Sequence, residues 1–294
     1  MSASSFAPLS FSIEIFPPRS PDAERRLAET LKRLDPHAPD FISVTFTGGD
    51  GALDRSATTI ARTRRQTKTP IAAHLTCAGA SKVDSLSAAQ TFTSLGVKHV
   101  VALRGDAENN ASGGYETAAE LVAALRSNGD FRISVAAYPD PHPLSQSQTA
   151  DLDNLVAKFD AGADDAITQF FFEPESFLRL RDQLAARGVD KPLIPGVLPI
   201  VDFAQTRRFA LRCGAHVPEQ LTQSFKRLRQ YPSQAELFSI AYTLDLIDQL
   251  AQEGVDRFHI YSLNQSRLPE QLMTLSRAGA ALAVADQAVR NARR

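Results

Sequence analysis

Residues 71–104 read IAAHLTCAGASKVDSLSAAQTFTSLGVKHVVALR, and this stretch decides the fold. Ile71–Thr76 and His99–Arg104 are short, mostly apolar runs that read as buried strands, and Lys82–Leu95 between them has the period of an amphipathic helix. Two strands joined by such a helix lie parallel, because the crossover between them is right-handed in nearly all proteins. The stretch therefore predicts a βαβ unit of a parallel sheet.

The same unit recurs along the whole chain. The expected strands are Phe11–Phe16, Phe41–Phe46, Ile71–Thr76, His99–Arg104, Arg132–Tyr138, Ala166–Phe171, Leu193–Pro199 and Phe258–Leu263. The expected helices between them are Asp22–Leu34, Arg55–Arg65, Lys82–Leu95, Glu116–Arg126, Ala150–Ala161, Pro174–Arg187 and Ala235–Glu253. Eight strands that alternate with helices predict an α/β fold, and the count favours closure into a parallel (β/α)8 TIM barrel.

We expect a single barrel domain over residues 1–294, because no linker or low-complexity tract interrupts the alternation. The chain is longest between the seventh and eighth strands, where Asp202–Cys213 and Pro218–Arg229 are helix-like, so an elaborated segment is expected there. The Ala-rich tail from Pro269 to Arg294 predicts a C-terminal helix.

Charge and composition exclude several classes of function. The net charge is −1, from 32 basic and 33 acidic residues, and the basic residues are spread along the chain, which argues against a nucleic-acid partner. Two distant cysteines, Cys77 and Cys213, support neither a disulfide framework nor a metal cluster. No leader-like start and no run of eighteen apolar residues occur, so we expect a cytoplasmic protein outside the membrane.

Polar residues stand in or after several expected strands, where the active site of a parallel barrel is built. Glu14 lies between Ile13 and Ile15, and a carboxyl group buried among apolar side chains stays protonated and is a proton donor. Asp106 follows the fourth strand and Gln169 ends the sixth, where its amide must find hydrogen-bond partners.

Each of these residues also has an ordinary structural interpretation. Glu14 could face outward or pair with a buried arginine, and Asp106 could cap the next helix. His74 could be a core histidine, and Phe209 could serve only in packing. The usual dinucleotide, phosphate-loop, zinc-protease and serine-hydrolase motifs are absent, so any flavin or nicotinamide would bind at the barrel mouth.

The chain resembles the bacterial methylenetetrahydrofolate reductase family over nearly its whole length. The resemblance rests on short motifs that follow one another in order from the first strand to the last. They are Phe11–Arg19, Ser43–Thr45, His74–Cys77, Ala102–Asp106, Ser134–Pro139, Ala161–Ala163, Ile167–Phe172, Pro195–Pro199 and Phe258–Asn264.

The resemblance implies a barrel flavoprotein that carries FAD. It would take hydride from NADH or NADPH and then reduce 5,10-methylenetetrahydrofolate to 5-methyltetrahydrofolate, a methyl source for methionine synthesis. By the same resemblance, Glu14 would protonate N10 of the folate, and Asp106 would lie near the flavin and the pterin. Gln169 would recognise the pterin or the nicotinamide carboxamide. Phe209 would stack on either substrate and Gln205 would contact the folate. The resemblance leaves room for a homo-oligomer.

The implied flavin contacts come from the ends of four strands, the segments that follow two of them, and one helix. They are Thr45, Phe46, His74, Arg104, Gly105, Asp106, Tyr115, Tyr138, His142, Asp151, Asn154 and Lys158.

The chain departs from the family at two positions. Ala157 stands where a basic residue usually precedes Lys158, which removes one charge partner of the FAD pyrophosphate. Gln265 stands where an arginine is a candidate for holding the folate glutamate tail.

Three other functions compete with this interpretation. Ala157 favours a flavin-independent reductase, whereas His74, Arg104 and Lys158 favour a flavoprotein. A non-catalytic folate- or flavin-binding subunit would have no need of the proton donor Glu14. A lyase or aldolase would need a Schiff-base lysine or metal ligands at the strand ends, and neither is found.

Overall fold

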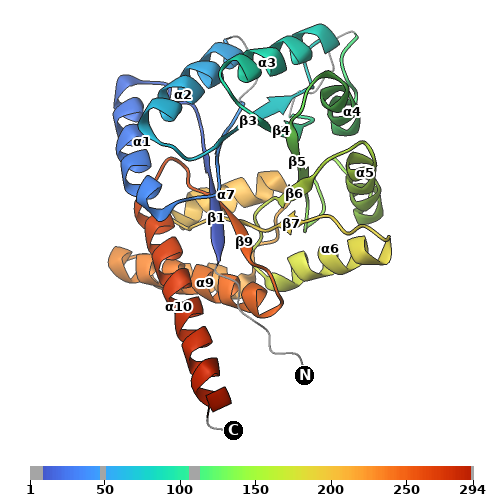
Figure 1. The fold of residues 1–294 in the computed structure, drawn as a ribbon. Helices are drawn as coiled ribbons and strands as arrows, with labels where there is room; N and C mark the ends of the chain where they lie inside the picture. The colour runs from blue at the N-terminus through green and yellow to red at the C-terminus, as the bar shows by residue number, and fades with distance from the viewer. Residues whose placement is uncertain (1–8, 47–50, 106–112, 293–294) are drawn as a thin grey trace.

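The computed structural model describes residues 9–46, 51–105 and 113–292, with side chains as far as residue 279. In this part of the chain, parallel strands form one sheet that curves into a barrel, and helices surround it (Figure 1). The strand order is β7-β6-β5-β4-β3-β2-β1-β9-β8. The structure therefore confirms the predicted (β/α)8 barrel.

The strands lie close to the predicted positions and are mostly shorter. Their bounds are β1 Ser10–Ile15, β2 Ile42–Val44, β3 Ile71–Thr76, β4 His99–Leu103, β5 Arg132–Ala137, β6 Asp165–Thr168, β7 Leu193–Ile194, β8 Gly196–Val197 and β9 Arg257–Tyr261.

The seventh barrel strand differs from the prediction, because it is divided into two at Pro195. β7 pairs with β6, whereas β8 pairs with β9, so this short stretch joins the two ends of the sheet. Proline has no N–H to donate to a neighbouring strand, which explains the break. Its carbonyl still accepts from the amide of His259 at 2.9 Å.

The helices cover the outside of the barrel and one of its ends. Their bounds are α1 Pro21–Leu34, α2 Ala52–Gln66, α3 Lys82–Ser94, α4 Ala118–Asn128, α5 Gln148–Asp160, α6 Pro174–Ala186, α7 Phe203–Cys213, α8 Glu219–Arg227, α9 Pro232–Gln252 and α10 Arg267–Ala292, with a short 3-10 helix η1 at Asp35–His37. Serine, threonine or aspartate side chains accept the first free amides of α1, α3, α4, α5 and α7, which fixes where these helices begin.

The segment between β8 and β9 carries α7, α8 and α9. A separate apolar cluster holds α7 and α8 beside the end of β6, and it includes Phe170, Phe172 and Phe225. The rings of Phe203 and Phe225 stack at 4.6 Å. Because this cluster is built at the carboxyl ends of the strands, it places α7 next to the mouth of the barrel.

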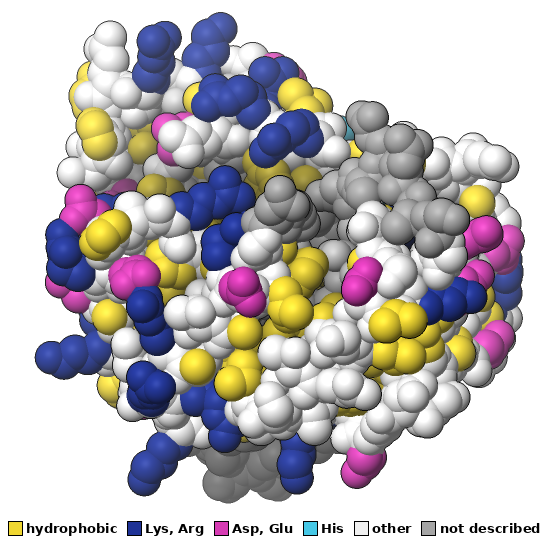
Figure 2. All heavy atoms as spheres, turned by 90° about the horizontal axis from the view of Figure 1, so that it is seen from above, with side chains coloured by type: hydrophobic (Ala, Val, Ile, Leu, Met, Phe, Trp, Pro, Cys, Tyr) yellow, Lys and Arg dark blue, Asp and Glu magenta, His cyan; other side chains and the backbone are white. Residues whose placement is uncertain are grey.

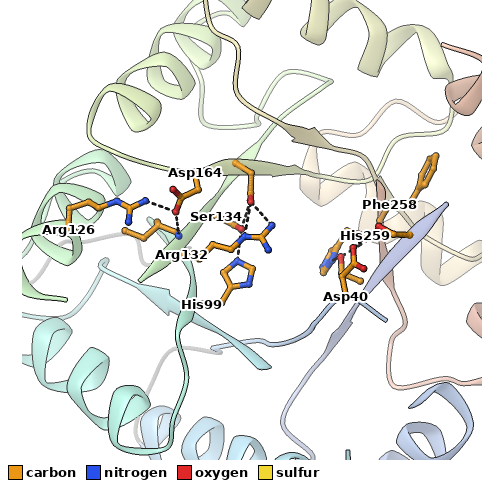
Figure 3. Close-up of polar contacts among 12 residues, drawn as sticks. Asp40, His99, Arg126, Arg132, Ser134, Asp164, Phe258 and His259 are labelled. Carbon is orange, nitrogen blue, oxygen red and sulfur yellow. Dashed lines mark hydrogen bonds and ion pairs between the residues drawn. The ribbon is translucent and has the colours of Figure 1, made fainter. Parts of the chain in front are cut away.

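A buried polar network closes the opposite end of the barrel (Figure 3). His99 Nε2 lies 2.7 Å from the Ser134 hydroxyl, which bonds to Asp165, and Arg132 binds the same carboxylate at 2.7 Å. On the other side of the barrel, the Ser12 hydroxyl lies 2.7 Å from Nδ1 of His259. These residues lie at the start or near the middle of their strands, so the network forms a floor below the cavity and leaves the mouth for ligands.

Candidate active site

A cavity of about 480 Å³ opens at the carboxyl ends of the strands. Its walls come from β1, β3, β4, β5, β6, β9 and α7 and from the loops that follow β5 and β6. The lining residues are Glu14, His74, Val101, Leu103, Ala136, Tyr138, His142, Ile167, Gln169, Phe209, Arg212, Cys213, His259 and Tyr261.

Glu14 is held in the deep part of this cavity, near the end of β1. Its side chain is 19% exposed, and its Oε2 lies 3.5 Å from Nε2 of His74. Burial raises the pKa of Glu14 to about 8 and lowers the pKa of His74 to about 3. At neutral pH both groups are therefore uncharged, so Glu14 holds a proton and His74 lies beside it as a neutral imidazole.

We expect activity that depends on this proton to fall as the pH rises through about 8. The acid is complete below that pH, and the carboxylate that forms above it has no proton to give. Stability falls as well, because a pKa raised in the folded state gives a contribution that is fully present below the ordinary value of 4.5 and is lost as the pH rises from there through about 8. A rate profile and a thermal-melting profile between pH 6 and pH 10 check both effects, and a flat rate profile contradicts the assignment.

Gln169 follows β6 directly and faces the same cavity as Glu14. Its side-chain amide oxygen accepts from the backbone N–H of Phe170 at 3.1 Å, and its backbone N–H donates to the carbonyl of Ala137 at 2.8 Å. The first bond gives the oxygen of this half-buried amide a partner, and the second holds the backbone of Gln169 against β5. The two residues predicted at the ends of the first and sixth strands therefore meet in one cavity.

Tyr261 links this side of the cavity to the place where the barrel closes. Its hydroxyl donates to the carbonyl of Thr168 at 2.8 Å, and the Thr168 hydroxyl accepts from the N–H of Gly196 at 2.9 Å. Burial raises the pKa of Tyr261 well above its ordinary value, so it remains a hydrogen-bond donor. These contacts fix the position of the wall beside Gln169.

Aromatic side chains form the outer walls. Phe209, on α7, lies with its ring 5.1 Å from that of Phe170 and lines the cavity. Tyr138 and His142 meet edge to face at 4.6 Å on the other side. Flat apolar walls of this kind suit a planar heterocycle.

Lys158 reaches toward this wall from α5. Its Nζ donates to the carbonyl of Ala136 at 2.8 Å and lies 5.9 Å from the centre of the Tyr138 ring. Burial lowers the pKa of Lys158 to about 8, while the nearby Asp151 opposes that shift. The carboxylate of Asp151 in turn accepts a hydrogen bond from the backbone N–H of His142 at 2.9 Å, which ties α5 to the loop that follows β5.

Other predicted ligand residues lie around the mouth. The Thr45 hydroxyl oxygen is buried and has no hydrogen-bond partner among the described residues. Phe46 packs at the edge of the core, and Arg104 is exposed after β4. Gly105 has φ +91°, and a Cβ there would lie 2.9 Å from Cβ of Thr76, so this turn requires glycine.

The remaining predicted residues are not in the cavity wall. Tyr115 is buried in the main core with the Lys82 ammonium 5.3 Å from its ring centre. Asn154, Gln205 and Gln265 are exposed. Asp106 lies outside the described residues.

The lining residues that sequence reasoning did not predict include Arg212, Cys213 and His259. Arg212 carried a usable signal, because it stands three positions after Phe209 on the same helix and shares its face. His259 lay inside a recognised strand motif, but nothing in its neighbours distinguished an inward side chain from an outward one.

No described helix combines the length and the apolar character needed to cross a bilayer. Within the same residues, no group of three or more His, Cys, Asp or Glu side chains is arranged to hold a metal ion.

Comparison with known proteins gives a consistent result. The family model described as methylenetetrahydrofolate reductase matches residues 4–277. The chain is 41% identical over 260 residues to the 5,10-methylenetetrahydrofolate reductase of Pectobacterium carotovorum subsp. carotovorum, which covers 88% of this chain and 87% of the relative. It is 38% identical to the enzyme of the same name from Escherichia coli K12, with 88% of each chain covered.

A solved structure supports the architecture. Dihydropteroate synthase from Xanthomonas albilineans, determined with 7,8-dihydropteroate, matches with a TM-score of 0.51 at 16% identity and covers 93% of both chains. At this identity the likeness concerns the fold alone.

Proposed function

The chain belongs to the methylenetetrahydrofolate reductase family, and from this we propose that it reduces 5,10-methylenetetrahydrofolate to 5-methyltetrahydrofolate with FAD and a reduced nicotinamide. The observation that carries the proposal is the meeting of a protonated acid, Glu14, and an amide, Gln169, in one cavity with aromatic walls. The setting would be the cytoplasm, and the product would supply methyl groups for methionine synthesis.

Glu14 supplies the proton that the substrate needs. The carbon to be reduced is bridged between N5 and N10 of the folate, and it accepts hydride poorly in that form. Transfer of the Glu14 proton to N10 lets the bond from that carbon to N10 break, which leaves an electrophilic iminium at N5. Addition of hydride to the iminium carbon then gives the N5-methyl group, and Glu14 is left as a carboxylate that must take up a proton again.

Gln169 and Phe209 orient the substrates. The amide presents both a donor and an acceptor to the edge of a pterin or of a nicotinamide carboxamide. The Phe209 ring offers a flat apolar face to either ring system. Because both substrates would use the same walls, we propose that they bind in turn and that the reaction is ping-pong.

The residues present fit FAD. The buried Thr45 oxygen with no partner among the described residues would gain a hydrogen bond from a ligand, and Lys158 offers a cation to a phosphate. When bound, FAD supplies a two-electron carrier between the nicotinamide and the folate.

Replacing Lys158 with Met is expected to weaken FAD binding by about tenfold or more, because a charge-assisted contact to phosphate is lost and the exposed Ala157 offers no substitute. Titration of apoprotein with FAD, followed by flavin fluorescence, measures the dissociation constant. Lys98→Met is the matched control, since Lys98 is exposed and precedes β4 at the other end of the barrel. Equal affinity in the two variants contradicts the role of Lys158.

An anaerobic absorbance spectrum tests the proposed function as a whole. Purified protein should show flavin bands that bleach with NADH or NADPH and return when 5,10-methylenetetrahydrofolate is added. Turnover without flavin bands would instead support direct transfer from the nicotinamide, for which Ala157 is the supporting observation. Bound ligand without turnover would support a non-catalytic subunit.

A further inference from the structure

Helix α7 is rich in arginine and carries no acidic residue. The sequence of α7, FAQTRRFALRC, has Arg207, Arg208 and Arg212 and no carboxylate. All three arginines are exposed, and among the described residues none lies within ion-pair distance of an acidic group. Arginines that do pair with a carboxylate are Arg25, Arg33, Arg62, Arg126, Arg132, Arg179, Arg181, Arg187 and Arg267.

These cations gather beside the opening of the cavity. Figure 2 shows Lys and Arg side chains gathered along one edge of the molecule as it is seen from above. Arg212 itself lines the cavity, and its guanidinium lies 5.8 Å from the centre of the Phe209 ring. Arg208 stands one helical turn before Arg212 on the same face, whereas Arg207 points to another side of the helix.

Helix electrostatics explain only part of this arrangement. A cation in the last turn is stabilised by the helix dipole, which accounts for Arg212 as a structural residue. The dipole does not account for two further arginines in the middle of the helix or for the absence of acids. A guanidinium held at the rim of a cavity, in contact with an aromatic ring, is suited to form a bidentate hydrogen-bonded pair with a carboxylate.

We propose that Arg212, assisted by Arg208, binds the glutamate carboxylates of the folate substrate. The inference rests on the proposed function, because the folate is the substrate that brings a carboxylate-bearing tail to this cavity. With the proton donor Glu14 deep in the cavity and Phe209 in its outer wall, the tail leaves toward α7. A glutamyl unit has two carboxylates, which matches two guanidinium groups one turn apart. Gln265, the position that the family resemblance suggests for this role, is exposed and carries no charge.

The test compares two substrates that differ only in the tail. With 5,10-methylenetetrahydrofolate, Arg212→Ala should raise KM about fivefold and Arg208→Ala/Arg212→Ala about 20-fold, while kcat changes little. With 5,10-methylenetetrahydropteroate, which lacks the glutamate, wild type and variants should have the same KM. Added salt should raise the folate KM of the wild type more than that of the double variant. An unchanged folate KM in the double variant overturns the proposal.

Arg207→Ala is the matched control, since Arg207 is exposed on the same helix but lies off the shared face. It should leave both KM values unchanged. An increase in the folate KM equal to that of Arg212→Ala would indicate general electrostatic attraction of the tail in place of specific binding, and it would overturn the proposal. Calorimetric binding of 5-methyltetrahydrofolate and of its pteroate analogue gives a readout without turnover. If the wild type binds the folate more tightly than the pteroate but does not reduce either methylene compound, the proposed function fails while the inference about Arg212 stands.

Discussion

Replacing Glu14 with Gln will lower the rate of folate reduction by roughly 10²- to 10⁴-fold, the range that a positioned proton donor contributes. Gln has nearly the shape of a protonated Glu, but its amide does not release a proton to N10. Glu14 is uncharged at neutral pH, so the substitution changes neither the charge nor the packing of the cavity. Stopped-flow measurement of the folate step, separately from the nicotinamide step, gives the rate directly.

The nicotinamide step and the fold are the controls for this variant. Oxidation of the reduced nicotinamide with menadione as acceptor should keep its wild-type rate, because no proton to N10 is needed. At pH 9 the variant should also melt at a higher temperature than the wild type, in which ionisation of a buried carboxyl opposes folding. Wild-type folate reduction by Glu14→Gln would remove Glu14 from the mechanism.

The sequence predicted the meeting of Glu14 and Gln169 for a general reason. In a closed parallel barrel all carboxyl ends point to one mouth, so residues 155 positions apart in the chain lie in one cavity once the eight strands are recognised. The alternatives that Glu14 faces outward or pairs with a buried arginine are both wrong, because its side chain lines the cavity and its neighbour is His74.

Other features depended on tertiary contacts that local sequence does not encode. The pattern Leu193–Pro199 reads as one strand, and only the pairing of β7 with β6 and of β8 with β9 shows that it is divided. Arg212 reads as an ordinary basic residue near a helix end, and it becomes a cavity residue because the apolar cluster under α7 and α8 fixes that helix at the mouth.

Gly196→Ala is expected to destabilise the protein by about 3 kcal/mol or more, because the added methyl group meets atoms that have little freedom to move. A Cβ at Gly196 would lie 2.2 Å from the carbonyl oxygen of Thr168 and 2.5 Å from Cε2 of Tyr261. The first contact is with backbone, and the second is with a ring whose hydroxyl is bound to that same carbonyl. Relief of the overlap must therefore separate β8 from β6 and β9, where the two ends of the sheet meet. Chemical denaturation measures the loss as a lower midpoint.

Gly279→Ala is the control that separates the loss of stability at Gly196 from a general effect of replacing glycine with alanine. Gly279 is exposed within α10 and a Cβ there meets nothing within 4 Å, so alanine should stabilise the protein by about 0.5–1 kcal/mol through its higher helix propensity. If Gly196→Ala still folds, movement of Tyr261 disturbs the wall beside Gln169, and folate reduction should fall more than nicotinamide oxidation. A midpoint equal to that of the wild type would mean that the junction at Pro195 tolerates a side chain, and that closure of the barrel does not depend on the close approach of Gly196 to Thr168.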